Sequence, residues 1–317
     1  MTTGHRTDGA AADLGYAGRT TALWASGDYA KTVTELLCPL GRALVRASAI
    51  RPGDRVLDVA AGTGNVAIPA ALTGADVIAS DLCPELLDRG RELAQTRGAR
   101  LHWQVANAEA LPFDTNEFDA VLSCVGVMFA PQHQCAADEL VRVCKPGGII
   151  GLINWTSDGF MSELMTTIKP YLDAPQPGSQ PAARWGDAAY VRDLLGDRVS
   201  NFTAEQHTLR VVMFADGEAF RDYMKAHCPP PRAAYQRIAN DPRRVDELDD
   251  KLAALAERYL AGTPSTMEWD YLLVTARKRQ SPECVSPAMP SAVSHNSIRS
   301  DQFRDDKQCT RDDARRV

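Results

Sequence analysis

Residues 56–65 read Val-Leu-Asp-Val-Ala-Ala-Gly-Thr-Gly-Asn, and this stretch decides the fold of the chain. The apolar run from Arg55 to Ala60 predicts a buried strand, and the glycines after it predict a tight turn into a helix over Asn65–Leu72. In doubly wound α/β sheets, ligands bind beyond the carboxyl ends of the strands, where the strand order reverses. The stretch therefore predicts both a strand–turn–helix unit and the floor of a ligand site.

Alternating strands and helices continue on the C-terminal side of this unit. We expect strands at Asp76–Ser80, Leu101–Val105, Phe118–Cys124 and Ile149–Trp155, helices at Pro84–Thr96 and Ala136–Cys144, and a turn at Lys145–Gly148. Alternation with short connections is typical of a parallel sheet that is covered by helices on both faces.

The flanking regions lack this rhythm. Between Leu23 and Ile50 the apolar spacing predicts two short amphipathic helices that meet near Pro39. After Trp155 we expect a loop at Pro170–Pro181, a short helix at Tyr190–Leu195, a strand or strand pair at Phe202–Phe214, a helix at Ala215–Cys228 that ends at the prolines 229–231, a helix at Val245–Leu260 and a strand at Trp269–Ala276. The predicted segments are a flexible N-terminus (1–22), a helical lid (23–50), a cofactor-binding core (51–155), a substrate cap with the last strands (156–279) and a disordered tail (280–317).

The composition is that of a globular protein with a slight acidic excess. The 317 residues include 35 Lys+Arg and 41 Asp+Glu, a net charge of −6, which argues against a nucleic-acid partner. No apolar run is long enough for a membrane helix and residues 1–13 contain no apolar signal core, so we expect a cytoplasmic protein without a membrane span. The eight cysteines form no CxxC motif and show no zinc-finger spacing, which favours free thiols and no metal site.

An acidic residue stands at the end of the second strand. Asp81 follows Gly62 by 19 residues, a spacing that suits a carboxylate accepting hydrogen bonds from a ribose diol. Gly62, Gly64 and Ala67 also satisfy the dinucleotide form G-x-G-x-x-A, so a nicotinamide-dependent reductase is an alternative. Asp58 favours another ligand, because its charge inside the first strand would repel a pyrophosphate and suit an amino group. No basic residue follows the turn, and the chain contains no Tyr-x-x-x-Lys pair of the kind that such a reductase needs.

Five motifs in this order resemble those of the class I S-adenosylmethionine-dependent methyltransferases. They are VLDVAAGTGN (56–65), VIASD (77–81), QVANAEALPF (104–113), FDAVLS (118–123) and RVCKPGG (142–148). Within that family the chain is similar to the ubiquinone/menaquinone-biosynthesis type and its bacterial small-molecule relatives. The resemblance covers Val56–Trp155, about a third of the chain. It implies an α/β fold with a seven-stranded, doubly wound, Rossmann-like sheet, an N-terminal helical lid and a C-terminal helical insert. The family's antiparallel last strand is matched by Trp269–Ala276, with Phe202–Arg210 as the sixth strand.

The resemblance also implies which residues hold S-adenosylmethionine. By position, Asp58 matches the acidic residue of the first motif, and Ala60, Gly62 and Gly64 match the loop that lies under the methionine part. Asp81 is implied to hold the ribose hydroxyls, and Leu82 to lie beside the adenine. Asn107 and Ala108 are implied to contact the adenine edge, and Cys124 to lie beneath the cofactor at the end of the fourth strand. Asn107 departs from the Asp that the family often carries there, although its amide oxygen can still accept a hydrogen bond from the exocyclic amine. N-terminal helices often cover the cofactor in this fold, so Tyr29 is a candidate to stack there, with simple packing within the lid as the other interpretation.

The reaction implied is methyl transfer to a small acceptor, apolar or aromatic. An in-line displacement depends mainly on the alignment of nucleophile, methyl carbon and sulfur, and an easily ionised acceptor needs no strong base. The chain has no acidic pair suited to an amine and no NPPY-type tetrad at the fourth strand, which favours O- or C-methylation. The residues expected to line an apolar acceptor pocket are Met128, Phe129, Trp155, Trp185 and Tyr223. His133, after the fourth strand, is the candidate general base, with a surface loop histidine as the other interpretation. A catalytically idle cofactor-binding protein is the remaining alternative.

Overall fold

The computed structural model describes residues 18–280, all of which belong to one unit of the chain, Met1–Ser281. The predicted disordered tail therefore lies outside the described residues except for Gln280, and so does most of the predicted flexible N-terminus. Residues 18–22 are described, and they are helical as part of a short helix over 18–24.

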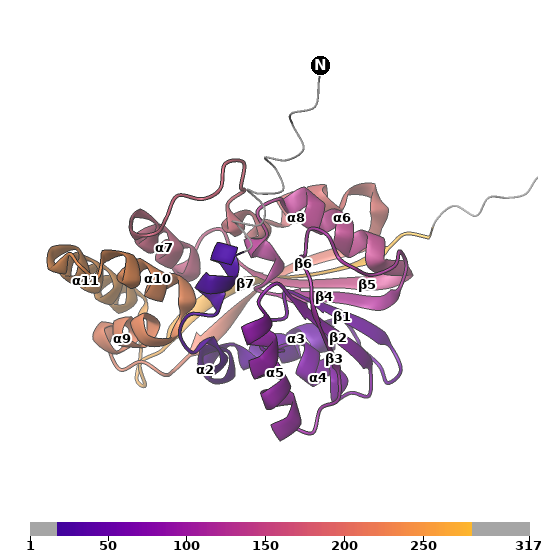
Figure 1. The fold of residues 1–317 in the computed structure, drawn as a ribbon, viewed down its shortest axis with the longest axis horizontal. Coiled ribbons are helices and arrows are strands. Elements are labelled where there is room, and N and C mark those ends of the chain that lie inside the picture. Colours follow the sequence, from indigo (N-terminus) through magenta and orange to yellow (C-terminus); the bar gives the residue numbers. More distant parts are fainter. Residues whose placement is uncertain (1–17, 281–317) are drawn as a thin grey trace, which may run out of the picture. The chain divides into compact units, whose positions relative to one another are not determined.

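A seven-stranded sheet forms the centre of this unit (Figure 1). The strands are β1 (Arg55–Val59), β2 (Asp76–Asp81), β3 (His102–Val105), β4 (Phe118–Cys124), β5 (Cys144–Trp155), β6 (Val199–Val211) and β7 (Met267–Lys278), in the order β3-β2-β1-β4-β5-β7-β6. The strands β1 to β5 pair in parallel, and β7 runs antiparallel between β5 and β6. The strand order reverses between β1 and β4, which places the ligand site predicted at the end of β1 at this switch point. The predicted fold class is confirmed, including the antiparallel last strand.

Helices cover both faces of the sheet. The helices on or beside it are α2 (Tyr29–Thr32), α3 (Cys38–Ala47), α4 (Ala67–Ala71), α5 (Pro84–Thr96), α6 (His133–Val143) and α8 (Ala188–Leu195), and those beyond one end of it are α7 (Phe160–Ile168), α9 (Gly217–His227), α10 (Pro229–Ile238) and α11 (Pro242–Tyr259). In Figure 1, α3, α4 and α5 lie on one face, α6 and α8 lie on the other, and α7, α9, α10 and α11 gather past the end of the sheet where β5 ends and β7 begins. The prediction of two helices near Pro39 corresponds to α2 and α3, which are joined by a π-helical turn over Val33–Leu37.

The central strands are apolar on both faces because helices bury both. Leu57, Val121 and Ile150, on three neighbouring strands, are each 0% exposed. Strand β6 is an edge strand, and buried residues are rare in its middle. Because the central strands are buried on both faces and β6 is not, only the central strands appear in the sequence as continuous apolar runs.

One local prediction was wrong, and one helix was not predicted. Lys145–Gly148 is not a separate turn but part of β5, where the pairing with β4 shifts register and Gly147 takes a φ of +79°. Such an irregularity inside a strand is a bulge, and bulges favour the same residues as turns. Helix α9 ends before the prolines at 229–231, as predicted, but these prolines also begin α10, because proline is tolerated in the first turn of a helix. None of the helices among residues 18–280 is both long and apolar enough to cross a bilayer.

Candidate active site

A cavity lies at the carboxyl ends of β1, β2 and β4 and encloses about 1020 Å³, counted with its open mouth. Eight of the ten residues predicted to hold the cofactor line it, namely Tyr29, Ala60, Gly62, Asp81, Leu82, Asn107, Ala108 and Cys124. They come from the last residues of β2 and β4, from the loops after β1, β2 and β3, and from α2, so the sheet brings together residues that are far apart in the sequence. The other two, Asp58 and Gly64, do not line this cavity.

The glycine loop forms the floor of the cavity. Gly62 has a φ of +55°, a conformation that L side chains rarely adopt. A Cβ atom at Gly62 would lie 3.7 Å from Cε1 of Tyr29, so a side chain there would fill the space between the floor and the ring above it. The loop thus leaves room for a ligand that touches the main chain.

Asp81 presents the carboxylate of the cavity. One of its oxygens accepts the Gly62 N–H at 2.8 Å and the other accepts the Cys83 N–H at 2.8 Å. Burial raises the pKa of Asp81, and the backbone N–H donors around it partly oppose that effect. Because each oxygen of a carboxylate has a second lone pair, Asp81 can still accept hydrogen bonds from two hydroxyls of a ligand. The cavity therefore fits a molecule with a vicinal diol.

Asp58 and Gly64 are surrounded by protein atoms rather than by the cavity. Asp58 is 1% exposed, and its Oδ2 accepts the Ala67 N–H at 2.9 Å, which ties β1 to the first turn of α4. Its Oδ1 has no hydrogen-bond partner among the described residues, and burial raises the pKa of Asp58 to about 8. A Cβ atom at Gly64 would lie 2.8 Å from the ring of Trp103. Both residues shape the loop from below.

The loop after β3 supplies the expected adenine edge. Ala106, Asn107 and Ala108 line the cavity, and the Ala106 N–H donates to the Asp81 carbonyl at 2.9 Å. The side-chain oxygen of Asn107 accepts the Glu109 N–H at 3.0 Å, which leaves that oxygen one further lone pair for a ligand.

An aromatic lid covers the cavity. The ring of Trp24 lies 5.4 Å from the ring of Tyr29 and 4.9 Å from that of Phe129, and all three line the cavity. Burial raises the pKa of the Tyr29 hydroxyl, so this group is protonated at neutral pH. Thr20 and Thr21 in the helix over 18–24 line the cavity as well. The sequence offered no signal for them, because residues 18–22 show no apolar period.

A second cavity adjoins the first and is larger, about 1570 Å³ with its open mouth. Its wall is mostly apolar and includes four of the eight methionines of the chain, Met128, Met161, Met165 and Met224, together with Trp155, Leu164 and Trp269. The two cavities share five residues, Trp24, Tyr29, Leu37, Val125 and Phe129. The two cavities therefore meet at these five residues, most of which are apolar.

Three of the five residues expected in the acceptor pocket line this second cavity, namely Met128, Phe129 and Trp155. Trp185 does not, because its side chain is fully buried beside His133. Tyr223 does not either, and its hydroxyl donates to Glu35 at 2.9 Å. The sequence missed Met161, Met165 and Met224, which lie in α7 and α9, because a methionine at helical spacing looks like ordinary core.

His133 lies at the start of α6 with its side chain buried, so it is not a surface loop residue. Its Nδ1 is 2.9 Å from the Tyr190 hydroxyl, and its ring lies 5.6 Å from the ring of Trp185. Burial and the nearby Arg184 lower the pKa of His133 to about 4. It lines neither cavity, and it is therefore left out of the site proposed below.

Two thiols line the cofactor cavity, Cys83 and Cys124, and only Cys124 was predicted there. It lies at the end of β4, and its Sγ is 3.8 Å from Nδ2 of Asn65. Burial raises the pKa of Cys124, so the thiol is protonated and is a poor nucleophile at neutral pH.

Comparison with known proteins agrees with this geometry. Residues 56–148 match the family model of a methyltransferase domain. An uncharacterized protein of Mycobacterium tuberculosis (strain H37Rv) is 50% identical over 258 residues, which cover 81% of this chain and 93% of that protein. A demethylmenaquinone methyltransferase of Clavibacter sepedonicus is 38% identical over 115 residues, 36% of this chain and 46% of that enzyme. The structure of a putative methyltransferase from Bacillus halodurans superposes with a TM-score of 0.50 at 20% identity, over 76% of this chain and 99% of that one.

The chain belongs to the class I S-adenosylmethionine-dependent methyltransferases, in one family with the mycobacterial protein. It is an enzyme, and its cofactor is S-adenosylmethionine. The nicotinamide-dependent reductase and the idle cofactor-binding protein are thereby set aside.

Proposed function

We propose that this enzyme transfers the methyl group of S-adenosylmethionine to the oxygen or carbon of a small, apolar or aromatic acceptor bound in the second cavity. One observation carries the proposal, namely that the methionine-rich cavity shares an apolar wall with the cavity that contains Asp81. Methionine side chains adapt to flat and irregular ligands and make favourable contacts with aromatic rings. The cavity is thus suited to an aromatic acceptor.

The residues of the cofactor cavity have distinct tasks in this proposal. Asp81 accepts the ribose hydroxyls, the Gly62 loop supports the methionine part, and Asn107 and Ala108 meet the adenine edge. S-adenosylmethionine supplies an electrophilic methyl group on a positively charged sulfur when it is bound. The protein's contribution is to hold the two reacting molecules in line, which supplies much of the acceleration.

The methyl group would pass between the cavities where they meet. At this junction the ring of Trp24 contacts those of Tyr29 and Phe129 edge to face, and these three apolar side chains would limit the access of water. Positive charge becomes less concentrated as the methyl group leaves sulfur, so a water-poor junction favours the transition state over the ground state.

No protein base is required in this proposal. Among residues 18–280, no histidine or glutamate lines either cavity, and burial raises the pKa of the thiols that line them, Cys83, Cys124 and Cys228. The charged side chains on the wall of the second cavity are Lys169 and Asp173, and Asp173 is largely exposed and pairs with Arg237. The proposal therefore favours an acceptor that ionises by itself, as a phenol or an activated ring carbon does. An amine that is protonated at neutral pH would bring its charge into an apolar cavity, which disfavours N-methylation.

The test is methyl transfer to a panel of acceptors. The wild type is incubated with S-adenosylmethionine and with naphthols, hydroxyquinones, simple phenols and aromatic amines, and S-adenosylhomocysteine and the methylated product are measured. We expect turnover with phenolic or quinone-type acceptors, and kcat/KM should rise with pH up to the pKa of each acceptor. Turnover confined to amines, or one common pKa for acceptors of different acidity, would contradict the proposal. A common pKa would indicate a protein base.

A further inference from the structure

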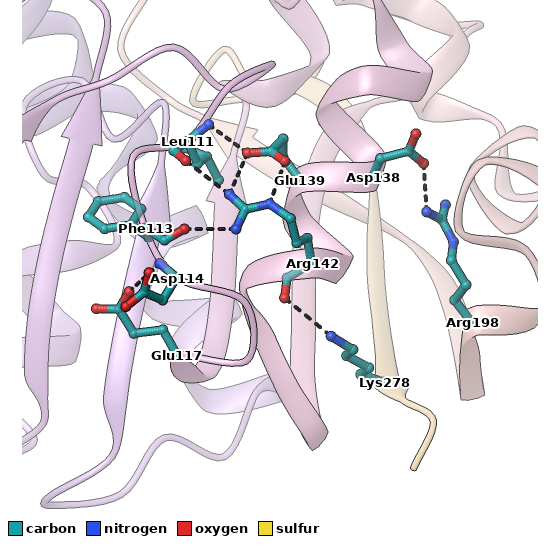
Figure 2. Close-up of polar contacts among 9 residues, drawn as sticks. All are labelled: Leu111, Phe113, Asp114, Glu117, Asp138, Glu139, Arg142, Arg198 and Lys278. Carbon is teal, nitrogen blue, oxygen red and sulfur yellow. Dashed lines mark hydrogen bonds and ion pairs between the residues drawn. The ribbon is translucent and has the colours of Figure 1, made fainter. Parts of the chain in front are cut away.

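The loop that carries the adenine edge is attached to α6 through two charged side chains. Residues 106–117 connect β3 to β4, and the part around Leu111 and Phe113 lies against α6 (Figure 2). Arg142 donates to the Phe113 carbonyl at 2.7 Å and to the Leu111 carbonyl at 2.9 Å. Glu139 accepts the Leu111 N–H at 2.6 Å. The two side chains thus satisfy both backbone groups of Leu111 and one of Phe113.

Glu139 and Arg142 are also locked to each other. Nε of Arg142 lies 2.6 Å from one oxygen of Glu139, and Nη2 lies 2.7 Å from the other, which is a bidentate pair. The side chains are 16% and 31% exposed, so water screens the pair only partly. Helix α6 itself packs on β4 and β5, which makes it a rigid support.

A second contact joins the same loop to the start of α6. The Gln132 N–H, at the N-cap of that helix, donates to Glu109 at 2.6 Å. Glu109 in turn donates its own N–H to the side chain of Asn107. The position of Asn107 therefore depends on α6 through two routes, one near each end of the segment from Asn107 to Phe113.

We propose that Glu139 and Arg142 are positioning residues for the cofactor, which hold Asn107 and Ala108 in register with the adenine edge and so set the enzyme's preference for a 6-amino purine. This inference rests on the proposed roles of Asn107 and Ala108. It requires no contact between the ion pair and the ligand, since neither residue lines the cavity.

The chain offers a matched control on the same helix. Arg198 pairs with Asp138 of α6 at 2.6 Å and bonds two backbone carbonyls, those of Leu194 and Leu195, but it does not touch the loop (Figure 2). Arg142→Lys and Arg198→Lys each keep the positive charge but remove the planar guanidinium group, which donates hydrogen bonds to several acceptors at once. The dissociation constants of S-adenosylhomocysteine and S-inosylhomocysteine, which lacks the 6-amino group, are measured for the full chain by titration calorimetry.

We expect the wild type to prefer S-adenosylhomocysteine, Arg142→Lys to lower that preference about fivefold or more, and Arg198→Lys to leave it unchanged. A merely structural role would weaken both ligands equally and would not change the ratio. If Arg142→Lys fails to fold, Glu139→Gln serves instead, since it keeps the shape and one acceptor oxygen. In an Asn107→Ala background, Arg142→Lys should have no further effect on the ratio.

An unchanged ratio in a folded Arg142→Lys or Glu139→Gln protein would overturn the inference, and so would a wild type that binds both ligands equally. The proposed function would survive both of these results. A wild type that does not bind S-adenosylhomocysteine would instead refute the assignment of the cavity itself.

Discussion

The cofactor cavity and the acceptor cavity lie side by side but are built differently. The first consists mainly of backbone and short side chains at strand ends, such as Ala60, Gly62 and Ala106, around one partly buried carboxylate, Asp81. The second consists of large side chains from separate segments, such as Met128, Met165 and Trp269. A cavity made of backbone is fixed by the sheet and suits one constant ligand, whereas a cavity made of side chains can change its shape without any change of fold. The following substitutions should affect one cavity and spare the other.

The largest effect on the cofactor side is expected from Gly62→Val. The new side chain would occupy the cavity and strain a residue with φ of +55°, so binding of S-adenosylhomocysteine should weaken about 100-fold or more, equivalent to about 2.7 kcal/mol. Titration calorimetry measures the loss. Gly53→Val is the control, because Gly53 has a φ of +85° and open space around it. Equal losses in both variants would show that backbone strain, not the cavity, is responsible.

Asp81→Ala should have the next largest effect. Removal of hydrogen bonds to a charged group costs about 1.5–3 kcal/mol, so affinity for S-adenosylhomocysteine should fall roughly 10- to 150-fold. Asp76→Ala is the control at the other end of β2, where the carboxylate is half exposed and pairs with Arg55. Unchanged binding by the Asp81 variant would remove the ribose assignment.

Met161→Trp should affect the acceptor cavity alone. The larger side chain would fill part of that cavity, and we expect kcat/KM for the acceptor to fall about tenfold, which corresponds to the roughly 1–3 kcal/mol that overpacking costs. The affinity for S-adenosylhomocysteine should not change. Met213→Trp, at a position 41% exposed outside both cavities, is the control. A parallel loss of cofactor affinity would mean that the two cavities are not independent.

His133→Gln should have the smallest effect, on acid stability rather than on turnover. The pKa of His133 is about 4 in the folded protein and 6.5 in the unfolded chain, so the unfolded state binds a proton first as the pH falls below 6.5. Stability is lost in that window, and at pH 5 the loss amounts to roughly 2 kcal/mol. Urea unfolding at pH 7 and pH 5 should show a smaller loss for the variant than for the wild type. A collapse of kcat at pH 7 in a folded variant would restore His133 as a base.

Much of the cofactor cavity was predictable because most of its predicted residues end or follow a strand. Asp81 is the last residue of β2, and Leu82 follows it. Gly62 lies in the loop after β1, and Cys124 is the last residue of β4. Parallel strands bring their carboxyl ends to one edge of the sheet, so a residue that ends or follows such a strand is expected to lie at the ligand site. The exception is Asp58, which lies within β1 and whose side chain caps the loop from below instead of lining the cavity.

The acceptor cavity was predicted only in part. Trp155 and Met128 were expected there, but Trp185 faces the core beside His133, and α10 was not expected at all. Side chains on helices outside the sheet acquire their direction from packing between elements, which no local pattern encodes. Local patterns were therefore enough to predict the sheet, its switch point and the residues that follow each strand, since apolar runs and glycine turns act locally. The methionines that line the acceptor cavity, the burial of His133 and the contact of Arg142 with the loop after β3 depend on long-range packing, because those contacts join segments that are distant along the chain.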